Sequence, residues 1–454
     1  MLVFFSIFLI IISILSEFYF LRHGTSLRLM NIPNLLYIYI LRPIAILSVG
    51  TSLLYSREFD INNYKLAWFL ASLYILFENM GYYLTFPRLK GIRTAIPSNG
   101  LSDFENSKSI QTILRVNFWL ILISILFLFL MFLTAGTSFL AQNRNMAMVA
   151  VNPLLRYFYP FVQLSAALLG FLSVVLITLY KKFFTGIFFF IISLFLTSLI
   201  YQRGMTIAFV MLSSMISLDI YRIKGELNLK KAFKFLLVLV VLFFILIFLR
   251  DIYNFVVTGQ IDLFKSLQKN ITNNSNQLLV LLIIRPDGDI LEVWTILLRY
   301  LSKNPPLLGN SLIKIPFMLT SSNFRLSTGM KTGVDILNEY YDFNTYWYKK
   351  YGFNLNVAQE MVLNFSFVGV FFGFVTGLFN GLLTKWYYKK VLNGDFFRST
   401  IYFNSFSYFL GTFASFQWMV FQLAFSEIIT LLAKVRINLL VKDNAEVKGF
   451  FYEI

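Results

Sequence analysis

Residues 183–200 read FFTGIFFFIISLFLTSLI, a run of largely apolar side chains in which no residue carries a charge. A helix of this length approaches the thickness of the hydrocarbon core of a bilayer, which takes about 20 apolar residues to cross. Similar apolar runs recur along most of the 454-residue chain. The stretch therefore predicts one membrane-spanning helix among many, in an all-α, polytopic integral membrane protein.

The composition of the whole chain agrees with this fold class. Hydrophobic residues make up 58% of the chain and charged residues only 13%, with a mean hydropathy of +0.70, whereas a soluble protein carries roughly 25% charged residues. We therefore exclude a soluble enzyme, a nucleic-acid-binding domain and a disordered scaffold, although the formal net charge is +17. Cysteine is absent and His23 is the single histidine, so thiol-based and histidine-cluster metal sites are excluded, and no cofactor is expected.

Eleven stretches have roughly the length and the apolar character of transmembrane helices. They lie near residues 2–20, 35–55, 66–86, 117–140, 157–180, 183–200, 205–221, 232–249, 361–384, 400–416 and 418–434. The last two are the weakest, because Gln417, Gln422 and Glu427 interrupt one long apolar tract. The first lacks the basic start and the small-residue cleavage site of a secretory signal, so we expect it to stay in place as a helix.

Lysine and arginine are distributed unevenly between the two sides of these segments. The loops after segments 1, 3, 5, 7 and 9, together with the C-terminal tail, hold 22 of them, whereas the short loops after segments 2, 4, 6 and 10 hold 5. Because short cytoplasmic loops collect these residues, we predict that the N-terminus is outside and the C-terminus is cytoplasmic. The chain then divides into helices 1–8 (1–249), one long outer loop (250–360), and helices 9–11 with the tail (361–454).

The outer loop is long, and its composition is that of folded rather than disordered chain. Residues 290–301 carry apolar side chains at helical spacing, with Glu292, Thr295 and Arg299 on the polar face. Asp289 and Glu292 fit a capping pattern at the start of this helix. We therefore expect short helices that lie on the outer surface and roof a cavity between the membrane helices.

Three arginines lie at the outer membrane boundary in otherwise apolar surroundings: Arg203, Arg250 and Arg285. A guanidinium binds phosphate through two hydrogen bonds and stays charged when it is desolvated. The three together would suit a pyrophosphate held at the level of the lipid headgroups. The alternative for each one is an anchor at a helix end that reaches the headgroups.

Two carboxylates are candidates for a general base. Asp287 follows Arg285 closely and could pair with it instead, while Glu360 begins segment 9 and could simply complement the helix dipole. Asn364 lies four residues after Glu360, so both side chains fall on one helix face. Three more charged residues lie within apolar spans, where an ionisable group is by default a functional candidate, although each could pair internally; they are Arg42, Glu78 and Glu427.

Aromatic residues concentrate at 340–353. An aromatic belt at the membrane interface explains most of them. Trp347 and Tyr348 within this group are the candidates for stacking on a sugar, and Asn364 is a further candidate for sugar binding.

The order of these elements resembles the Wzy-type polymerases of oligosaccharide repeat units, which include the O-antigen and enterobacterial common antigen polymerases. The resemblance covers roughly 195–390. It rests on Arg203-Gly204 in a short turn, Arg250 after the next helix, and then the loop motifs Arg285…Glu292-Val-Trp, Pro305-Pro-Leu-Leu-Gly309-Asn-Ser, Pro316-Phe and Gln359-Glu360-Met-Val-Leu-Asn364-Phe-Ser-Phe-Val-Gly369…Gly373…Gly377. One departure is Phe416-Gln417-Trp418, where some members carry an arginine before the last helix.

The resemblance implies a glycosyltransferase of the bacterial inner membrane that acts on the periplasmic face. Such proteins transfer an oligosaccharide from undecaprenyl pyrophosphate to another lipid-linked repeat unit, and so build surface polysaccharide of the lipopolysaccharide type without a metal. The implied partners are the lipid-linked oligosaccharide, membrane lipids and a membrane protein that regulates chain length. An O-antigen ligase with the same donor and a lipid-linked oligosaccharide flippase are the alternatives, although we find neither the internal repeat nor the distributed intramembrane charges expected of a transporter.

Overall fold

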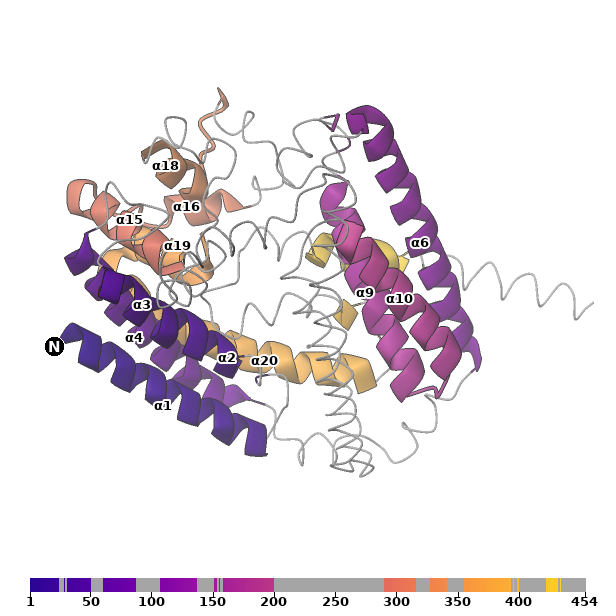
Figure 1. Ribbon diagram of the computed structural model, residues 1–454, viewed down its shortest axis with the longest axis horizontal. Coiled ribbons are helices and arrows are strands. Elements are labelled where there is room, and N and C mark those ends of the chain that lie inside the picture. The colour runs from indigo at the N-terminus through magenta and orange to yellow at the C-terminus, as the bar shows by residue number, and fades with distance from the viewer. Residues whose placement is uncertain are drawn as a thin grey trace, which may run out of the picture. The chain divides into compact units, whose positions relative to one another are not determined.

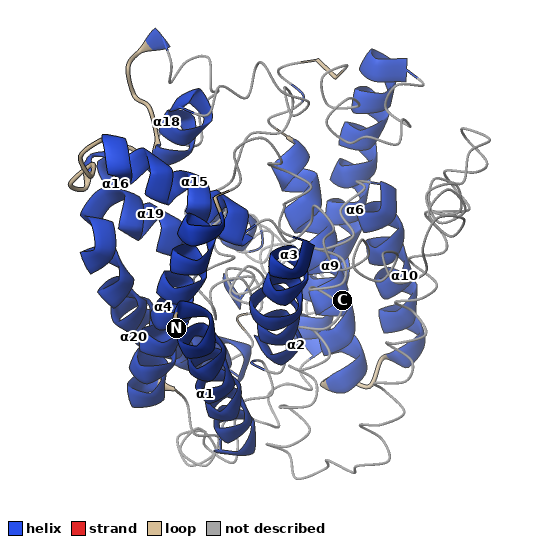
Figure 2. Ribbon diagram, turned by 60° about the vertical axis from the view of Figure 1, so that its left-hand side comes forward, coloured by secondary structure: helices blue, strands red, loops and turns tan. Residues whose placement is uncertain are grey.

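The computed structural model describes residues 1–23, 28, 31–49, 60–86, 107–136, 151–152, 155, 158–199, 290–315, 327–340, 355–392, 395, 398–399, 422–431 and 433. All regular secondary structure in these ranges is helical, and none of them contains a strand (Figures 1 and 2). The all-α prediction is therefore confirmed for this part of the chain.

The chain divides into two compact units. The first takes in residues 1–91, 240–386 and 404–420. Its helices are α1 (Leu2–His23), α2 (Asn31–Leu36), the π-helix η2 (Tyr37–Leu41), α3 (Arg42–Val49), α4 (Ile61–Thr85), α15 (Ile290–Lys303), α16 (Asn310–Ile313), α18 (Gly333–Tyr340), α19 (Val357–Phe365), the 3-10 helix η8 (Ser366–Phe371) and most of α20 (Phe372–Leu392). The second unit holds α6 (Ser107–Ala135), α9 (Tyr159–Thr178), α10 (Phe183–Leu199), the end of α20 and a helical run at 422–431.

Within the described residues, four helical stretches are long and apolar enough to cross a membrane. They are Leu2–Phe20, Ile110–Ala135, Phe161–Thr178 and Val357–Lys390, and shorter apolar helices lie at 34–48, 183–196 and 422–431. These stretches overlap predicted segments 1, 2, 4, 5, 6, 9 and 11, and α4 overlaps segment 3. The predicted segments 205–221, 232–249 and 400–416 lie outside the described residues. The chain thus has the helices of a membrane-embedded protein.

The apolar surface of these helices is distributed as a lipid environment requires. On α1 and α6, large apolar side chains face outward, such as Phe4 at 71% and Leu133 at 61% exposure. In the second unit α9 is the buried helix and packs against both α6 and α10. Ser193 of α10 donates a hydrogen bond to the Ala166 carbonyl of α9 at 2.7 Å. This bond between uncharged groups links the two helices.

Glycines bring α4 and α20 into backbone contact. A Cβ at Gly377 would lie on the Glu78 carbonyl oxygen and 2.7 Å from the Tyr82 nitrogen, and one at Gly81 would lie 2.9 Å from the Leu378 nitrogen. Gly373 likewise lies on the Tyr74 carbonyl. Small residues spaced by four form such close helix crossings in membranes, where lipid removes the hydrophobic drive between helices.

Proline explains the π-helical turn between α2 and α3. Pro43 has no backbone N–H, so the Tyr39 carbonyl four residues earlier lacks its ordinary helical donor. The indole Nε1 of Trp68, on α4, donates to that carbonyl at 2.9 Å, while the Arg42 N–H reaches back five residues to Tyr37. The turn is thereby tied to α4, and Arg42 begins α3 immediately after it.

Candidate functional site

The predicted site residues fall into two groups. Arg203, Arg250, Arg285, Asp287, Trp347 and Tyr348 lie outside the described residues. Glu360 and Asn364 are described, both are buried, and they lie one helical turn apart on α19. The candidate site is therefore built around α19.

The start of α19 is fixed by its own sequence. Asn356 accepts a hydrogen bond from the Gln359 N–H at 2.8 Å, and the Gln359 side chain accepts one from the Asn356 N–H at 3.0 Å, which is a capping box. Gln359 also donates from Nε2 to the Ile290 carbonyl at 2.9 Å. This bond ties the first turn of α19 to the first residue of α15, 69 positions earlier.

The motif at Pro305–Ser311 folds over the C-terminal end of α19. The Leu307 and Leu308 N–H groups donate to the carbonyls of Leu363 and Asn364 at 3.1 and 2.9 Å, which are last-turn carbonyls without intrahelical partners. Leu308 and Gly309 both have positive φ, 50° and 87°. Glycine accepts this conformation readily, and the turn leads directly into α16, which carries Ser311.

A chain of hydrogen bonds links that motif to Glu360. The Gly309 N–H donates to Asn364 Oδ1 at 3.0 Å, Asn364 Nδ2 donates to Ser311 Oγ at 2.7 Å, and the Ser311 hydroxyl donates to Glu360 Oε1. Asn364 Nδ2 also donates to the Glu360 carbonyl at 2.8 Å. Glu360 and Ser311 are each 1% exposed and Asn364 is fully buried.

The first residue of α18 covers the Glu360 carboxylate. A Cβ at Gly333 would lie 2.6 Å from both carboxylate oxygens, so only glycine fits there without a shift. Beside it, Asp335 accepts hydrogen bonds from the Thr332 N–H and hydroxyl at 2.9 and 2.7 Å. Glu360 is therefore buried in contact with residues of α16, α18 and α19.

A buried ion pair joins α3 to α15. Arg42 donates to Glu292 Oε1 at 2.6 Å, and both side chains are fully buried. The predicted helix at 290–301 is confirmed as α15, but Glu292 and Thr295 are buried rather than on a solvent-facing polar side. Glu292 is thus an ion-pair partner of Arg42, while Asp289, the other half of the predicted capping pattern, lies outside the described residues.

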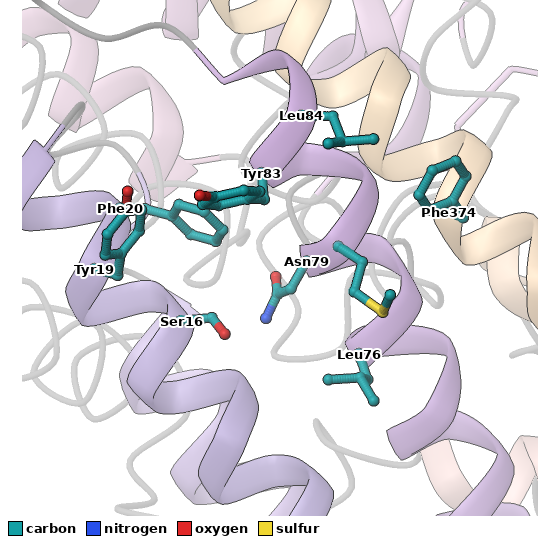
Figure 3. Close-up of a pocket in the computed structure, with 9 residues that line it drawn as sticks. Ser16, Tyr19, Phe20, Leu76, Asn79, Tyr83, Leu84 and Phe374 are labelled. Carbon is teal, nitrogen blue, oxygen red and sulfur yellow. The ribbon is translucent and has the colours of Figure 1, made fainter.

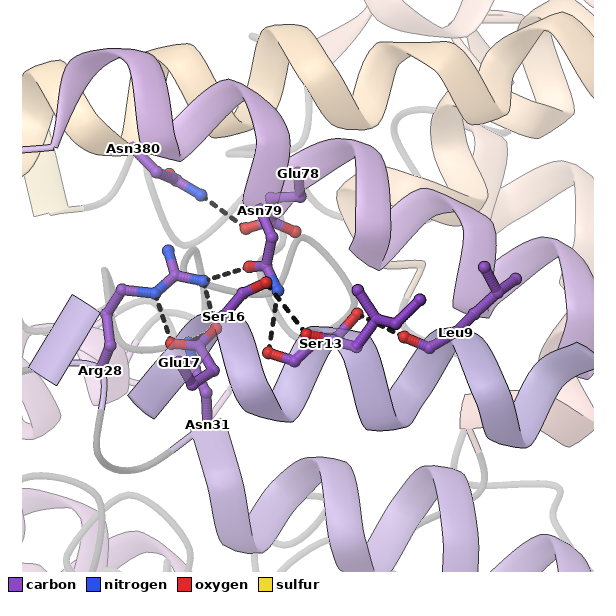
Figure 4. A network of polar contacts seen from close by, with 10 residues as sticks. Leu9, Ser13, Ser16, Glu17, Arg28, Asn31, Glu78, Asn79 and Asn380 are labelled. Atoms are coloured by element: carbon purple, nitrogen blue, oxygen red, sulfur yellow. Dashed lines mark hydrogen bonds and ion pairs between the residues drawn. The ribbon is translucent and has the colours of Figure 1, made fainter. Parts of the chain in front are cut away.

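A second buried network lies between α1 and α4 (Figure 4). The Arg28 guanidinium binds both carboxylate oxygens of Glu17, donates to Asn79 at 2.7 Å, and lies 4.0 Å from the centre of the Tyr82 ring. Burial alone would lower the pKa of Arg28, but attraction to Glu17 outweighs it and the pKa is raised. Nearby, Asn380 donates to Glu78 at 2.8 Å, which gives that buried carboxylate a partner on α20.

An apolar groove of about 370 Å³ opens beside this network (Figure 3). Tyr19, Phe20 and Tyr83 line it together with Leu76, Met80, Leu84 and Phe374, while Ser16 and Asn79 are the polar residues in its wall. A lipid chain could occupy such a groove. Its lining holds no carboxylate, lysine, arginine or histidine.

Metal binding has no support in the described parts of the chain, since no three His, Cys, Asp or Glu side chains group closely enough there to hold an ion. Several carboxylates are buried in those parts, and Glu360 is the one that the predicted motifs supply with a hydroxyl and an amide beside it. Sequence reasoning found Glu360 and Asn364 but missed Ser311 and Gly333. Ser311 is the last residue of the motif that begins at Pro305. Its place in that motif is the sequence feature that could have identified it.

Comparison of the chain with models of known protein families, with curated proteins and with solved structures finds no match in any of the three.

Proposed function

We propose that this chain is a membrane glycosyltransferase that polymerises lipid-pyrophosphate-linked oligosaccharide repeat units into a surface polysaccharide on the outer face of the bacterial inner membrane. The proposal rests on the order of sequence motifs that resembles the Wzy-type polymerases. One structural observation supports it best. The Ser311–Glu360 hydrogen bond joins two of those motifs across 49 positions of the chain.

A third motif belongs to the same assembly. The Glu292-Val-Trp stretch lies in α15, which Gln359 ties to α19 through the Ile290 carbonyl. Trp294 is fully buried in the core that α15 shares with α4 and α19. Segments that matter to one activity are expected to be held together on a rigid scaffold, and these three are.

The proposed reaction needs a base and a site for the leaving group. The hydroxyl of one repeat unit attacks the anomeric carbon of another, the bond from that carbon to the pyrophosphate oxygen breaks, and the electron pair leaves on the lipid pyrophosphate. Glu360 or Asp287 takes the hydroxyl proton. Arg203, Arg250 and Arg285 neutralise the charge that develops on the pyrophosphate.

The burial of Glu360 bears on how this base would work. An enclosed carboxylate meets a hydroxyl only after Gly333 and the start of α18 move away. The proposal therefore includes an outer loop that closes over Glu360 when no acceptor is bound.

The test is the size ladder of surface and lipid-linked polysaccharide in cells that lack this chain. The deletion is complemented with wild type, Arg203→Ala, Arg285→Ala, Glu360→Ala and the control Glu339→Ala, which removes an acidic side chain that is 60% exposed on α18. A polymerase leaves a cap of one repeat unit in the deletion, and Glu339→Ala restores the ladder where the three site variants fail. An additional membrane protein that sets chain length is expected to change the modal length only.

Other outcomes identify other functions. Polymer that forms but stays on the lipid pyrophosphate indicates a ligase. Repeat units that remain on the cytoplasmic face indicate a flippase and would place the Glu360 cluster outside the chemistry.

A further inference from the structure

The hydrogen-bond chain on α19 has a fixed direction. Asn364 Oδ1 accepts from the Gly309 backbone N–H, which can only donate, so the amide nitrogen must point the other way. That nitrogen has two hydrogens, and both are used, one on Ser311 Oγ and one on the Glu360 carbonyl. The orientation of the Asn364 side chain thus follows from its partners rather than from an assumption about the amide.

The direction continues through Ser311. Its oxygen accepts from Asn364, so its single hydrogen remains for Glu360 Oε1. Both side chains are almost fully buried, so water does not compete for these bonds. The carboxylate is therefore held by one oxygen, and its rotation about the last side-chain bond is restricted.

From this geometry we infer that Ser311 is a positioning residue for Glu360. It holds Oε1 by a hydrogen bond and so fixes the plane of the carboxylate, both oxygens of which lie against Gly333, the position from which an acceptor hydroxyl would approach once α18 moves. The inference rests on the proposed function, in which Glu360 is the base. Ser311 itself touches neither sugar nor pyrophosphate in this proposal.

The structure also explains why a serine at this place can do this. Positive φ at Leu308 and Gly309 turns the chain into α16 directly over α19. The two backbone bonds to the carbonyls of Leu363 and Asn364 hold that turn in place without Ser311. Removal of the hydroxyl should therefore free the carboxylate while the turn remains folded.

The experiment compares full-length wild type, Ser311→Ala, Ser311→Thr and Ser302→Ala in vesicles. Ser302→Ala is the matched control, because that hydroxyl is exposed and bonds only the Arg299 carbonyl of its own helix. The probe is the lipid-linked repeat unit extracted from the deletion strain. The rate of polymer formation is measured against its concentration, and the thermal unfolding midpoint of each variant is recorded.

We expect Ser311→Ala to lower the maximal rate roughly tenfold to hundredfold, the range for a lost hydrogen bond to a charged group. The half-saturating concentration should stay as in the wild type. The unfolding midpoint should fall by a few degrees only, because Asn364 Nδ2 and Glu360 Oε1 each lose one buried partner while the turn stays folded. Ser311→Thr, which keeps the hydroxyl, should recover most of the rate, and Ser302→Ala should match the wild type.

Three results overturn the inference alone, each with an active wild type: full activity of Ser311→Ala, equal loss in Ser311→Ala and Ser311→Thr, or a loss that appears only as a raised half-saturating concentration. A wild-type rate per folded molecule, with the whole loss explained by unfolded protein, assigns Ser311 to folding and also overturns it. Absence of polymer with the wild-type protein overturns the proposed function, and this inference with it.

Discussion

Arg42 and Glu292 form a fully buried ion pair at 2.6 Å although they lie 250 positions apart in the chain. The pair connects an apolar helix near the N-terminus to a helix of the long loop. Loss of one partner leaves the other charge buried, which is the costly case, whereas replacement of both by apolar groups often costs little.

We therefore expect Arg42→Met alone to lower the free energy of unfolding by about 3–5 kcal/mol. The double variant Arg42→Met with Glu292→Leu should recover much of that loss. Unfolding of the purified protein in detergent, followed as loss of the monodisperse species on heating, measures both. Lys303→Ala, an exposed cation at the end of the same α15, serves as the control. Equal unfolding midpoints for Arg42→Met and the control would contradict the predicted role of this pair.

The contact of α4 with α20 predicts a strong effect of one methyl group. In Gly377→Ala the new Cβ meets the backbone of Glu78 and Tyr82, which cannot rotate away as a side chain would. We expect a loss of about 1–3 kcal/mol, the usual cost of overpacking. Val375→Ala, at a position on α20 that is 55% exposed, should stay within about 0.5 kcal/mol of wild type. A wild-type unfolding midpoint for Gly377→Ala would show that the helices are farther apart than described.

The Arg28 network predicts that lysine cannot replace arginine there. Arg28→Lys keeps the charge but loses the two-point contact with Glu17 and the stacking on Tyr82. The expected loss of stability is about 1–2 kcal/mol, from one charged hydrogen bond and a desolvated cation–π contact. Arg22→Lys on the exposed end of α1 is the paired control, and both are read by the same thermal assay. If the two variants unfold together, the network does not stabilise the fold.

The absence of cysteine makes the predicted orientation directly testable. Ser302→Cys and Lys182→Cys each place a single thiol at an exposed position. If the N-terminus is outside, a membrane-impermeant maleimide added to intact spheroplasts labels Ser302→Cys at once and Lys182→Cys only after lysis. The reverse pattern would invert the topology, and simultaneous labelling of both would refute the separation of these positions by the bilayer.

The helical fold was predictable because apolar runs of membrane length are long-range averages that single residues do not overturn. Helix α15 was predictable for a different reason: its apolar side chains repeat at helical spacing over several turns. The partner of Glu292 was not, because the capping pattern with Asp289 is local and strong, whereas the approach of Arg42 depends on the tertiary fold. An arginine within an apolar span indicates that an acidic partner exists without indicating where.

The candidate site was predictable in part for a similar reason. Glu360 and Asn364 share a helix face through their spacing alone, so sequence could pair them. Ser311 reaches them only because Leu308 and Gly309 turn the chain at positive φ. Gly333 can cover the Glu360 carboxylate only because it has no side chain. No sequence pattern indicates which glycine makes such a contact.

The glycine-lined contact between α4 and α20 also determines when these two helices can pack during synthesis. Tyr74 on α4 and Thr376 on α20, which share a hydrogen bond of 2.7 Å, are 302 positions apart. At synthesis rates of about 5–20 residues per second, α4 waits roughly 15–60 s for its partner. During that interval the glycine face of α4 and the Glu78 carboxylate lack the contacts that α20 later makes with them.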